Sequence, residues 1–174
     1  VGGTNEEKGM DDMKYYVSQC GAPDAGFTPD GLFPMSFTER GINYYFMSYG
    51  LAGKSTSKVR VVGLHGVEIL NMVPDRASAE LEASDETEAG RVMGLVEEYR
   101  RTTGRDVTAS REGTRIRLTS RGLCAHSCTP FNGKNAIVAI LMFLDGLGID
   151  GSMGTFLRFF AEKIGMTTDG SLLG

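Results

Sequence analysis

Side chains suited to metal or acid-base chemistry gather in three places. Glu6 and Glu7 are adjacent carboxylates ahead of an amphipathic segment, Asp24 and Asp30 lie in a loop rich in proline, glycine and aspartate, and His126 stands between Cys124 and Cys128. One carboxylate of a pair can bind a metal ion while its neighbour takes a proton from metal-bound water. Adjacent glutamates at the start of a helix also favour the helix dipole, so the pair alone does not establish a metal site.

His126 is expected on a loop between a strand and a buried helix. Ile116 and Leu118 alternate with polar residues ahead of it, and apolar residues at 136, 137, 140, 141 and 144 follow it with helical spacing. Apolar side chains at 138, 142 and 143 predict that this helix is buried on more than one side. A histidine alone in such a loop commonly does no more than hydrogen-bond the loop backbone.

The Cys-Ala-His-Ser-Cys run could in principle hold a zinc ion or act in redox chemistry. Zinc would need a fourth donor, and the sequence has no second pair of closely spaced cysteines and no histidine besides His126 and His65. Ordinary semi-buried cysteines are therefore the favoured interpretation of Cys124 and Cys128.

The helices and strands expected around these residues indicate an α+β fold. Expected helices run from about Met10 to Val17, from a capping box at Asp85 and Glu88 to about Thr102, from Ala136 to Leu144, and from Phe156 to Ile164 before Gly165. Expected strands cover 42–49, 58–64, 77–83, 106–110 and 114–120. Strand, helix, strand, strand, helix after residue 77 is a split βαβ pattern, so we expect a ferredoxin-like antiparallel sheet with helices on one face.

Bulk composition is that of an ordinary globular protein. The chain has 174 residues, of which 41% are hydrophobic and 23% charged, and its net charge is -4. No apolar run approaches the roughly 20 residues of a membrane span, and an odd number of cysteines favours free thiols in a reducing compartment. We therefore expect a cytoplasmic protein with no membrane or nucleic-acid partner.

Three motifs together resemble a known family. Gly122, Ala125, His126 and Pro130 form G-x-x-A-H-x-x-x-P, and Gly133, Asn135 and Ala136 form G-x-N-A, as in zinc-dependent metallopeptidases of the aminoacylase/carboxypeptidase type. The GTNEE and PDGLFP segments near the start, and NMVPDRASA from Asn71, resemble the carnosine-dipeptidase branch of that family, among them bacterial dipeptidases. The resemblance covers nearly the whole chain.

The resemblance implies a role for each matching residue. Glu6 would be the general base, Glu7 and Asp30 would be ligands in a site for two zinc ions, His126 would stabilise the oxyanion, and Asn71 would face the substrate. Asp24 matches no family position. Because the other metal ligands of the family have no counterpart here, we expect a fragment: residues 1–36 from the catalytic domain and 37–174 from the lid, or dimerisation-type, domain. Such a fragment would neither retain zinc nor hydrolyse peptides by itself.

The implied activity of the full-length protein is hydrolysis of a dipeptide or short peptide by metal-activated water. The remaining catalytic domain would be the partner of this chain, and a homodimer stays open. One alternative is an amidohydrolase of the same family that acts on N-acylated amino acids. Another is a ferredoxin-like nucleic-acid-binding module, suggested by seven arginines between Arg100 and Arg121, although the hairpin strands lack the aromatic residues that stack on bases.

Overall fold

The computed structural model describes Asn5 and residues 9–26, 46, 48, 50, 55–67 and 69–173. The chain divides into two compact units, Val1–Asn43 and Tyr44–Gly174, and each is described by itself. The expected domain boundary at residues 36 and 37 and most of the expected strand 42–49 lie outside the described residues and stay predictions. Within the described residues, every helix is too short or too polar to cross a lipid bilayer.

In the first unit the structure describes one helix, α1, which covers Asp11–Cys20. Its first turn carries Asp11 and Asp12, and an Asp12 carboxylate oxygen accepts the backbone N–H of Asn5 at 3.0 Å. Carboxylates in the first turn complement the positive end of the helix dipole. No residue of α1 is buried, so its expected apolar face finds no cover among the described residues.

The second unit is built on a four-stranded antiparallel sheet. The strands are β1 (Val59–Gly66), β2 (Arg76–Ala83), β3 (Asp106–Glu112) and β4 (Arg115–Arg121), in the order β1-β2-β4-β3. Helix α2 (Glu86–Thr103) connects β2 to β3, and β4 lies between these two strands. This arrangement is the split βαβ unit, and the predicted α+β class with an antiparallel sheet is confirmed.

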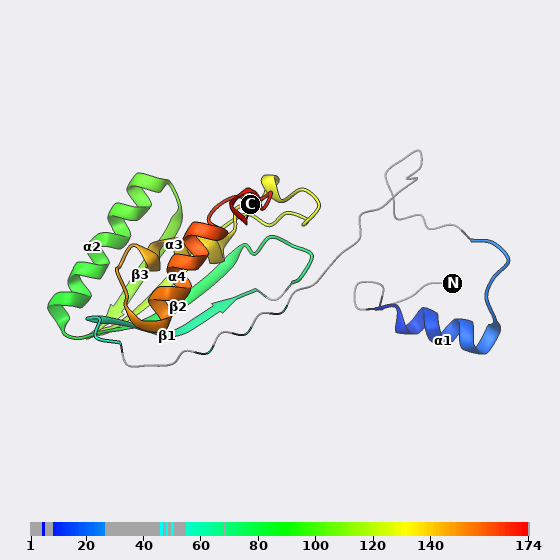
Figure 1. Cartoon of the computed structure of the whole chain (residues 1–174), viewed down its shortest axis with the longest axis horizontal. Coiled ribbons are helices and arrows are strands. Elements are labelled where there is room, and N and C mark those ends of the chain that lie inside the picture. Colours follow the sequence, from blue (N-terminus) through cyan, green and yellow to red (C-terminus); the bar gives the residue numbers. More distant parts are fainter. Residues whose placement is uncertain are drawn as a thin grey trace. The chain divides into compact units, whose positions relative to one another are not determined.

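One face of the sheet forms the core. Alternate residues of β2 are buried, and the residues between them are more exposed, as expected for a strand covered on one side. Helices α2 and α3 (Ala136–Asp145) both pack against β2, and α4 (Gly151–Lys163) packs on α3 (Figure 1). Two 3₁₀ turns, Pro130–Asn132 and Ser171–Leu173, complete the unit.

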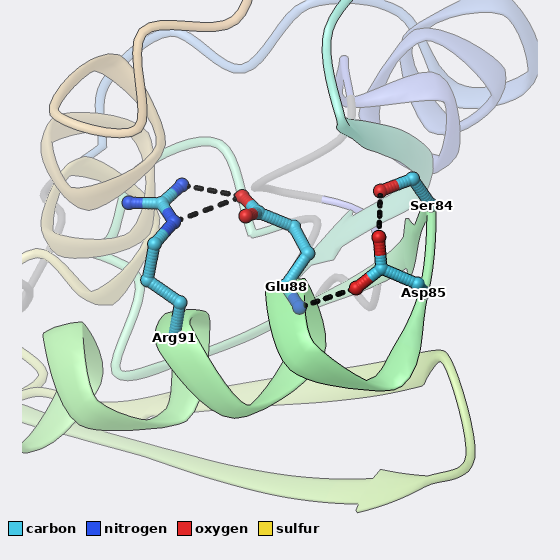
Figure 2. Close-up of polar contacts among 4 residues, drawn as sticks. All are labelled: Ser84, Asp85, Glu88 and Arg91. Atoms are coloured by element: carbon cyan, nitrogen blue, oxygen red, sulfur yellow. Dashed lines mark hydrogen bonds and ion pairs between the residues drawn. The ribbon is translucent and has the colours of Figure 1, made fainter.

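The start of α2 is capped by side chains, as Figure 2 shows. An Asp85 carboxylate oxygen accepts the Glu88 backbone N–H at 2.8 Å, and the Ser84 hydroxyl donates to the other oxygen at 3.0 Å. The Glu88 N–H, as the largest cause, lowers the pKa of Asp85. Among the described residues the Glu88 carboxylate accepts from the Arg91 guanidinium, at 2.6 and 2.9 Å. The predicted cap is therefore present in its Asp85 half.

Helix α3 is buried on more than one side, as its sequence predicts. Its buried residues are Ala136, Ala139, Ile140, Leu141, Phe143 and Leu144. The Tyr99 hydroxyl of α2 donates to the Ala139 carbonyl at 3.1 Å, and the Tyr99 ring meets Phe143 edge-on with centroids 5.5 Å apart. These contacts join α2 to α3, so α3 is a rigid support for the loop that precedes it.

Helix α4 begins earlier than its apolar pattern indicates, at Gly151 instead of Phe156. The preceding residue, Asp150, accepts hydrogen bonds from Ser55, Thr56 and Ser57, including the Thr56 N–H at 3.0 and 3.1 Å and the Ser57 hydroxyl at 2.7 Å. The segment before β1 is thereby attached to the start of α4, a contact between residues about ninety positions apart in the chain. As expected, α4 ends just before Gly165, whose φ is 56°.

Candidate functional site

Two loops at one end of the β2-β4 pair form the candidate site. Residues 69–75 lead into β2 and residues 122–135 follow β4. The Val73 N–H donates to the Ala125 carbonyl and the Ser127 N–H donates to the Asn71 carbonyl, each at 2.8 Å, with Met72 and His126 paired in an antiparallel bridge. The loops therefore extend the pairing of their strands and place the backbones of Asn71 and His126 side by side.

The glycines of the His126 motif are required by the close approach of two backbone segments. Leu123 and Lys134 exchange reciprocal N–H to carbonyl hydrogen bonds of 2.9 Å. A Cβ on Gly122 would lie 1.8 Å from the Lys134 carbonyl oxygen, and a Cβ on Gly133 would lie 2.9 Å from the Val73 side chain. Any larger residue at either position would push the loop apart.

Asn135 in the same motif caps helix α3. Its side-chain oxygen accepts the backbone N–H groups of Ile137 at 3.0 Å and Val138 at 3.1 Å, which would otherwise have no partner within the helix. Pro130 begins the short 3₁₀ turn, where its fixed φ and missing N–H cost nothing. The loop that carries His126 is thus bonded to residues 71–75 on one side and capped onto a buried helix on the other.

The His126 imidazole is exposed, and its Nδ1 atom has two partners in Cys128. The Cys128 backbone N–H donates to Nδ1 at 3.2 Å, and the Cys128 Sγ lies 3.0 Å from the same nitrogen. A nitrogen that accepts an N–H carries no proton of its own, so this hydrogen-bond network assigns the proton of the neutral ring to Nε2. Both Cys128 contacts are made through Nδ1, and Nε2 is therefore the hydrogen-bond donor of the ring.

The structure describes two of the five predicted site residues. Asn71 is partly buried and His126 is exposed, and the paired loops bring them together. Glu6, Glu7 and Asp30 lie outside the described residues, so their roles stay predictions. Within the described part of the chain, no group of three or more histidine, cysteine, aspartate or glutamate side chains could hold a metal ion.

The description of Cys124 and Cys128 as semi-buried is wrong, since both side chains are exposed and both thiols are free. They lie in the loop between β4 and α3. Sequence reasoning also missed that Cys128 is the partner of His126. The spacing of two residues was visible in Cys-Ala-His-Ser-Cys, but only a tight turn, closed by the Thr129 N–H on the His126 carbonyl at 2.9 Å, brings Sγ back to the ring.

Exposed apolar side chains occur on both loops. Ile69 and Leu70 precede Asn71 with 52% and 61% of their surface exposed, and Leu123 and Phe131 flank His126 with 53% and 72% exposed. Apolar side chains that gather in exposed loops favour a contact surface. The loops that carry Asn71 and His126 both expose such side chains.

The open face of the sheet does not resemble a single-strand RNA platform. Its cross-strand neighbours include Glu80 beside Arg117, joined at 2.7 Å, and Glu82 paired with Arg60. These arginines carry carboxylate partners, and β3 and β4 contain no aromatic residue to stack on a base. The site at the loops is the stronger candidate.

Comparisons with known proteins find relatives that are named as dipeptidases. No family model matches the chain. “Putative dipeptidase YtjP” of Bacillus subtilis is 28% identical over 172 residues, which are 98% of this chain and 36% of that protein. “Putative dipeptidase SH1171” of Staphylococcus haemolyticus is 27% identical over 188 residues, which are 99% of this chain and 39% of that protein. The chain thus spans less than two fifths of the length of these curated relatives and is similar to proteins named as dipeptidases along nearly all of its own length.

Proposed function

We propose that this chain is part of a metal-dependent dipeptidase, in which residues 37–174 act as a lid over a metal site that includes Glu7 and Asp30. The similarity to dipeptidase-named proteins supports the reaction class. The hydrogen bond from the Cys128 N–H to His126 Nδ1 is the single observation that carries the proposal, because it assigns the ring proton to Nε2 and gives the lid an N–H donor for the reaction.

The proposed task of His126 follows from its assigned tautomer. When water adds to a peptide carbonyl, the oxygen gains negative charge, and a preorganised N–H donor stabilises that charge more than it stabilises the neutral carbonyl. The Cys128 N–H occupies Nδ1, so the ring presents Nε2–H without needing to be protonated. A bound zinc ion would supply activated water for the attack, with Glu6 proposed as the base.

The loops give the donor a fixed position. Hydrogen bonds from Val73 and Ser127 hold the His126 loop against the Asn71 loop, and the Asn135 cap holds its other end on α3. Asn71, proposed to bind the substrate, would move together with His126 as one body. A peptide could then be oriented by Asn71 and by the nearby apolar side chains while Nε2–H approaches its carbonyl oxygen.

The proposal is tested by His126→Ala in the full-length dipeptidase. Loss of one oxyanion donor should lower kcat by about a hundredfold or more, while metal content and melting temperature change little. His65→Ala is the matched control, because His65 is also an exposed histidine but lies on β1, opposite Ser78 in the sheet. A His126→Ala enzyme that keeps its kcat but loses stability would make His126 a structural residue and refute the proposal.

Dipeptides and N-acylated amino acids separate the proposed function from its family alternative. A dipeptidase should hydrolyse unblocked dipeptides with the higher kcat/KM. An enzyme that prefers acylated amino acids would instead be an amidohydrolase, and the oxyanion role of His126 would apply to that reaction.

A further inference from the structure

The Cys128 thiol is placed as a nucleophile next to a base. Its Sγ lies 3.0 Å from His126 Nδ1, and both side chains are exposed. A thiol within hydrogen-bond distance of an imidazole is the pairing found in activated cysteines. The Cys128 backbone N–H donates to the same nitrogen at 3.2 Å, so the thiol and the N–H share one lone pair, and the N–H must release Nδ1 when the thiol proton is transferred.

The other two cysteines of the chain provide a comparison. Cys20 and Cys124 are also free and exposed, and neither thiol contacts a histidine among the described residues. Cys124 lies in the same loop as Cys128, two residues before His126 instead of two residues after it. Exposure and local sequence are therefore similar for Cys124 and Cys128, and the imidazole contact is what differs.

We propose that Cys128 is a modification site that reacts with low-molecular-weight disulfides, with His126 as the base. The Cys128 sulfur attacks one sulfur of a disulfide such as oxidised glutathione, a new S–S bond forms and the disulfide of the reagent breaks. The thiol proton passes to His126 Nδ1 and then to the departing thiolate, which leaves as a free thiol. Cys128 is oxidised to a mixed disulfide, and one half of the reagent is reduced.

The modification would regulate the site already described, and this consequence rests on the proposed function. A glutathione group attached to Cys128 would stand directly beside the His126 ring, and it would remove the thiol from Nδ1. Substrate could no longer place its carbonyl oxygen at Nε2, so oxidation would switch off the donor and a reducing thiol would restore it.

The test measures the reaction of each cysteine in this chain with oxidised glutathione. Samples taken over time are quenched with an alkylating reagent, and peptide mass spectrometry gives a rate for Cys20, Cys124 and Cys128 separately. Cys128 should react at least about tenfold faster than Cys124, a margin set below the roughly hundredfold that a positioned base typically contributes. His126→Ala should bring the Cys128 rate down to that of Cys124, and His65→Ala should change none of the three rates.

Unfolding provides a second measurement if His126→Ala disturbs the loop. In urea the wild-type rates of Cys124 and Cys128 should become equal, because the contact with His126 is lost. Rates for Cys124 and Cys128 in the folded protein that agree within about twofold would overturn the proposal, and so would a fast Cys128 that is unaffected by His126→Ala. Peptide hydrolysis plays no part in these rates, so they test the proposal for Cys128 independently of the dipeptidase function.

Discussion

Gly122→Ala should destabilise the fold around the candidate site. The added Cβ would lie 1.8 Å from the Lys134 carbonyl oxygen, whereas carbon and oxygen need about 3.3 Å. The two segments must then separate by about 1.5 Å, which breaks the reciprocal Leu123 and Lys134 hydrogen bonds at about 1 kcal/mol each. With about 1–3 kcal/mol of overpacking strain added, we expect a loss of about 3–5 kcal/mol in the free energy of unfolding.

Gly94→Ala is the matched control, because it makes the same chemical change in open space. Gly94 lies in the interior of α2 and is exposed, and an alanine Cβ at this position would have no neighbouring atom within 4 Å. Alanine favours a helix over glycine by about 0.8–1 kcal/mol, so this variant should be more stable than the parent chain. Gly122→Ala should therefore lower the free energy of unfolding, and Gly94→Ala should raise it.

Urea unfolding followed by circular dichroism measures both variants, with the slope of the transition as a check on two-state behaviour. Amide chemical shifts of residues 122–135 report whether the loop itself moves. The reasoning is refuted if Gly122→Ala and Gly94→Ala change stability by the same amount, or if Gly122→Ala leaves the loop shifts unchanged.

Two further variants test the supports of the site. Asn135→Ala should cost about 1 kcal/mol of unfolding free energy, because the α3 cap is lost. Asn135→Asp keeps an acceptor and should cost much less. Equal losses for the two variants in urea titrations would argue against capping. Asp150→Asn should lower the melting temperature at pH 7, because hydrogen bonds from Ser55 first, then Thr56 and Ser57, lower the pKa of Asp150 and stabilise its charged form. A carboxyl group with a lowered pKa stabilises the fold fully above its unfolded pKa of about 3.9, and this stabilisation is lost as pH falls through the folded pKa. The difference in melting temperature between the parent chain and Asp150→Asn should therefore shrink below about pH 4. A constant difference would contradict the assignment.

Much of the second unit was predictable because its signals are local. The alternation of Ala77 to Ala83 defined β2 and its buried face, and the cap at Asp85 and the stop at Gly104 defined α2 to within one residue. Hydrophobic repeats of two or 3.6 residues extend over short segments, so they can be recognised without knowledge of the fold. The same reasoning placed the start of α4 too late, because the hydrogen bonds to Asp150 come from residues 55–57, which are distant in sequence.

The sequence by itself determined the element order, the α+β class, and the resemblance that drew attention to Asn71 and His126. Only the tertiary structure decided that the two loops pair through Asn71 and Ser127, that Gly122 is required because Lys134 passes within contact distance, and that Cys128 faces Nδ1 of His126. The pairing of the loops and the approach of Lys134 to Gly122 depend on backbone segments that meet in space after β2 and β4 have paired, whereas the Cys128 contact depends on the turn closed by Thr129. Their hydrogen bonds join residues up to 62 positions apart, as for Ala136 and Pro74, and no local pattern encodes such a meeting.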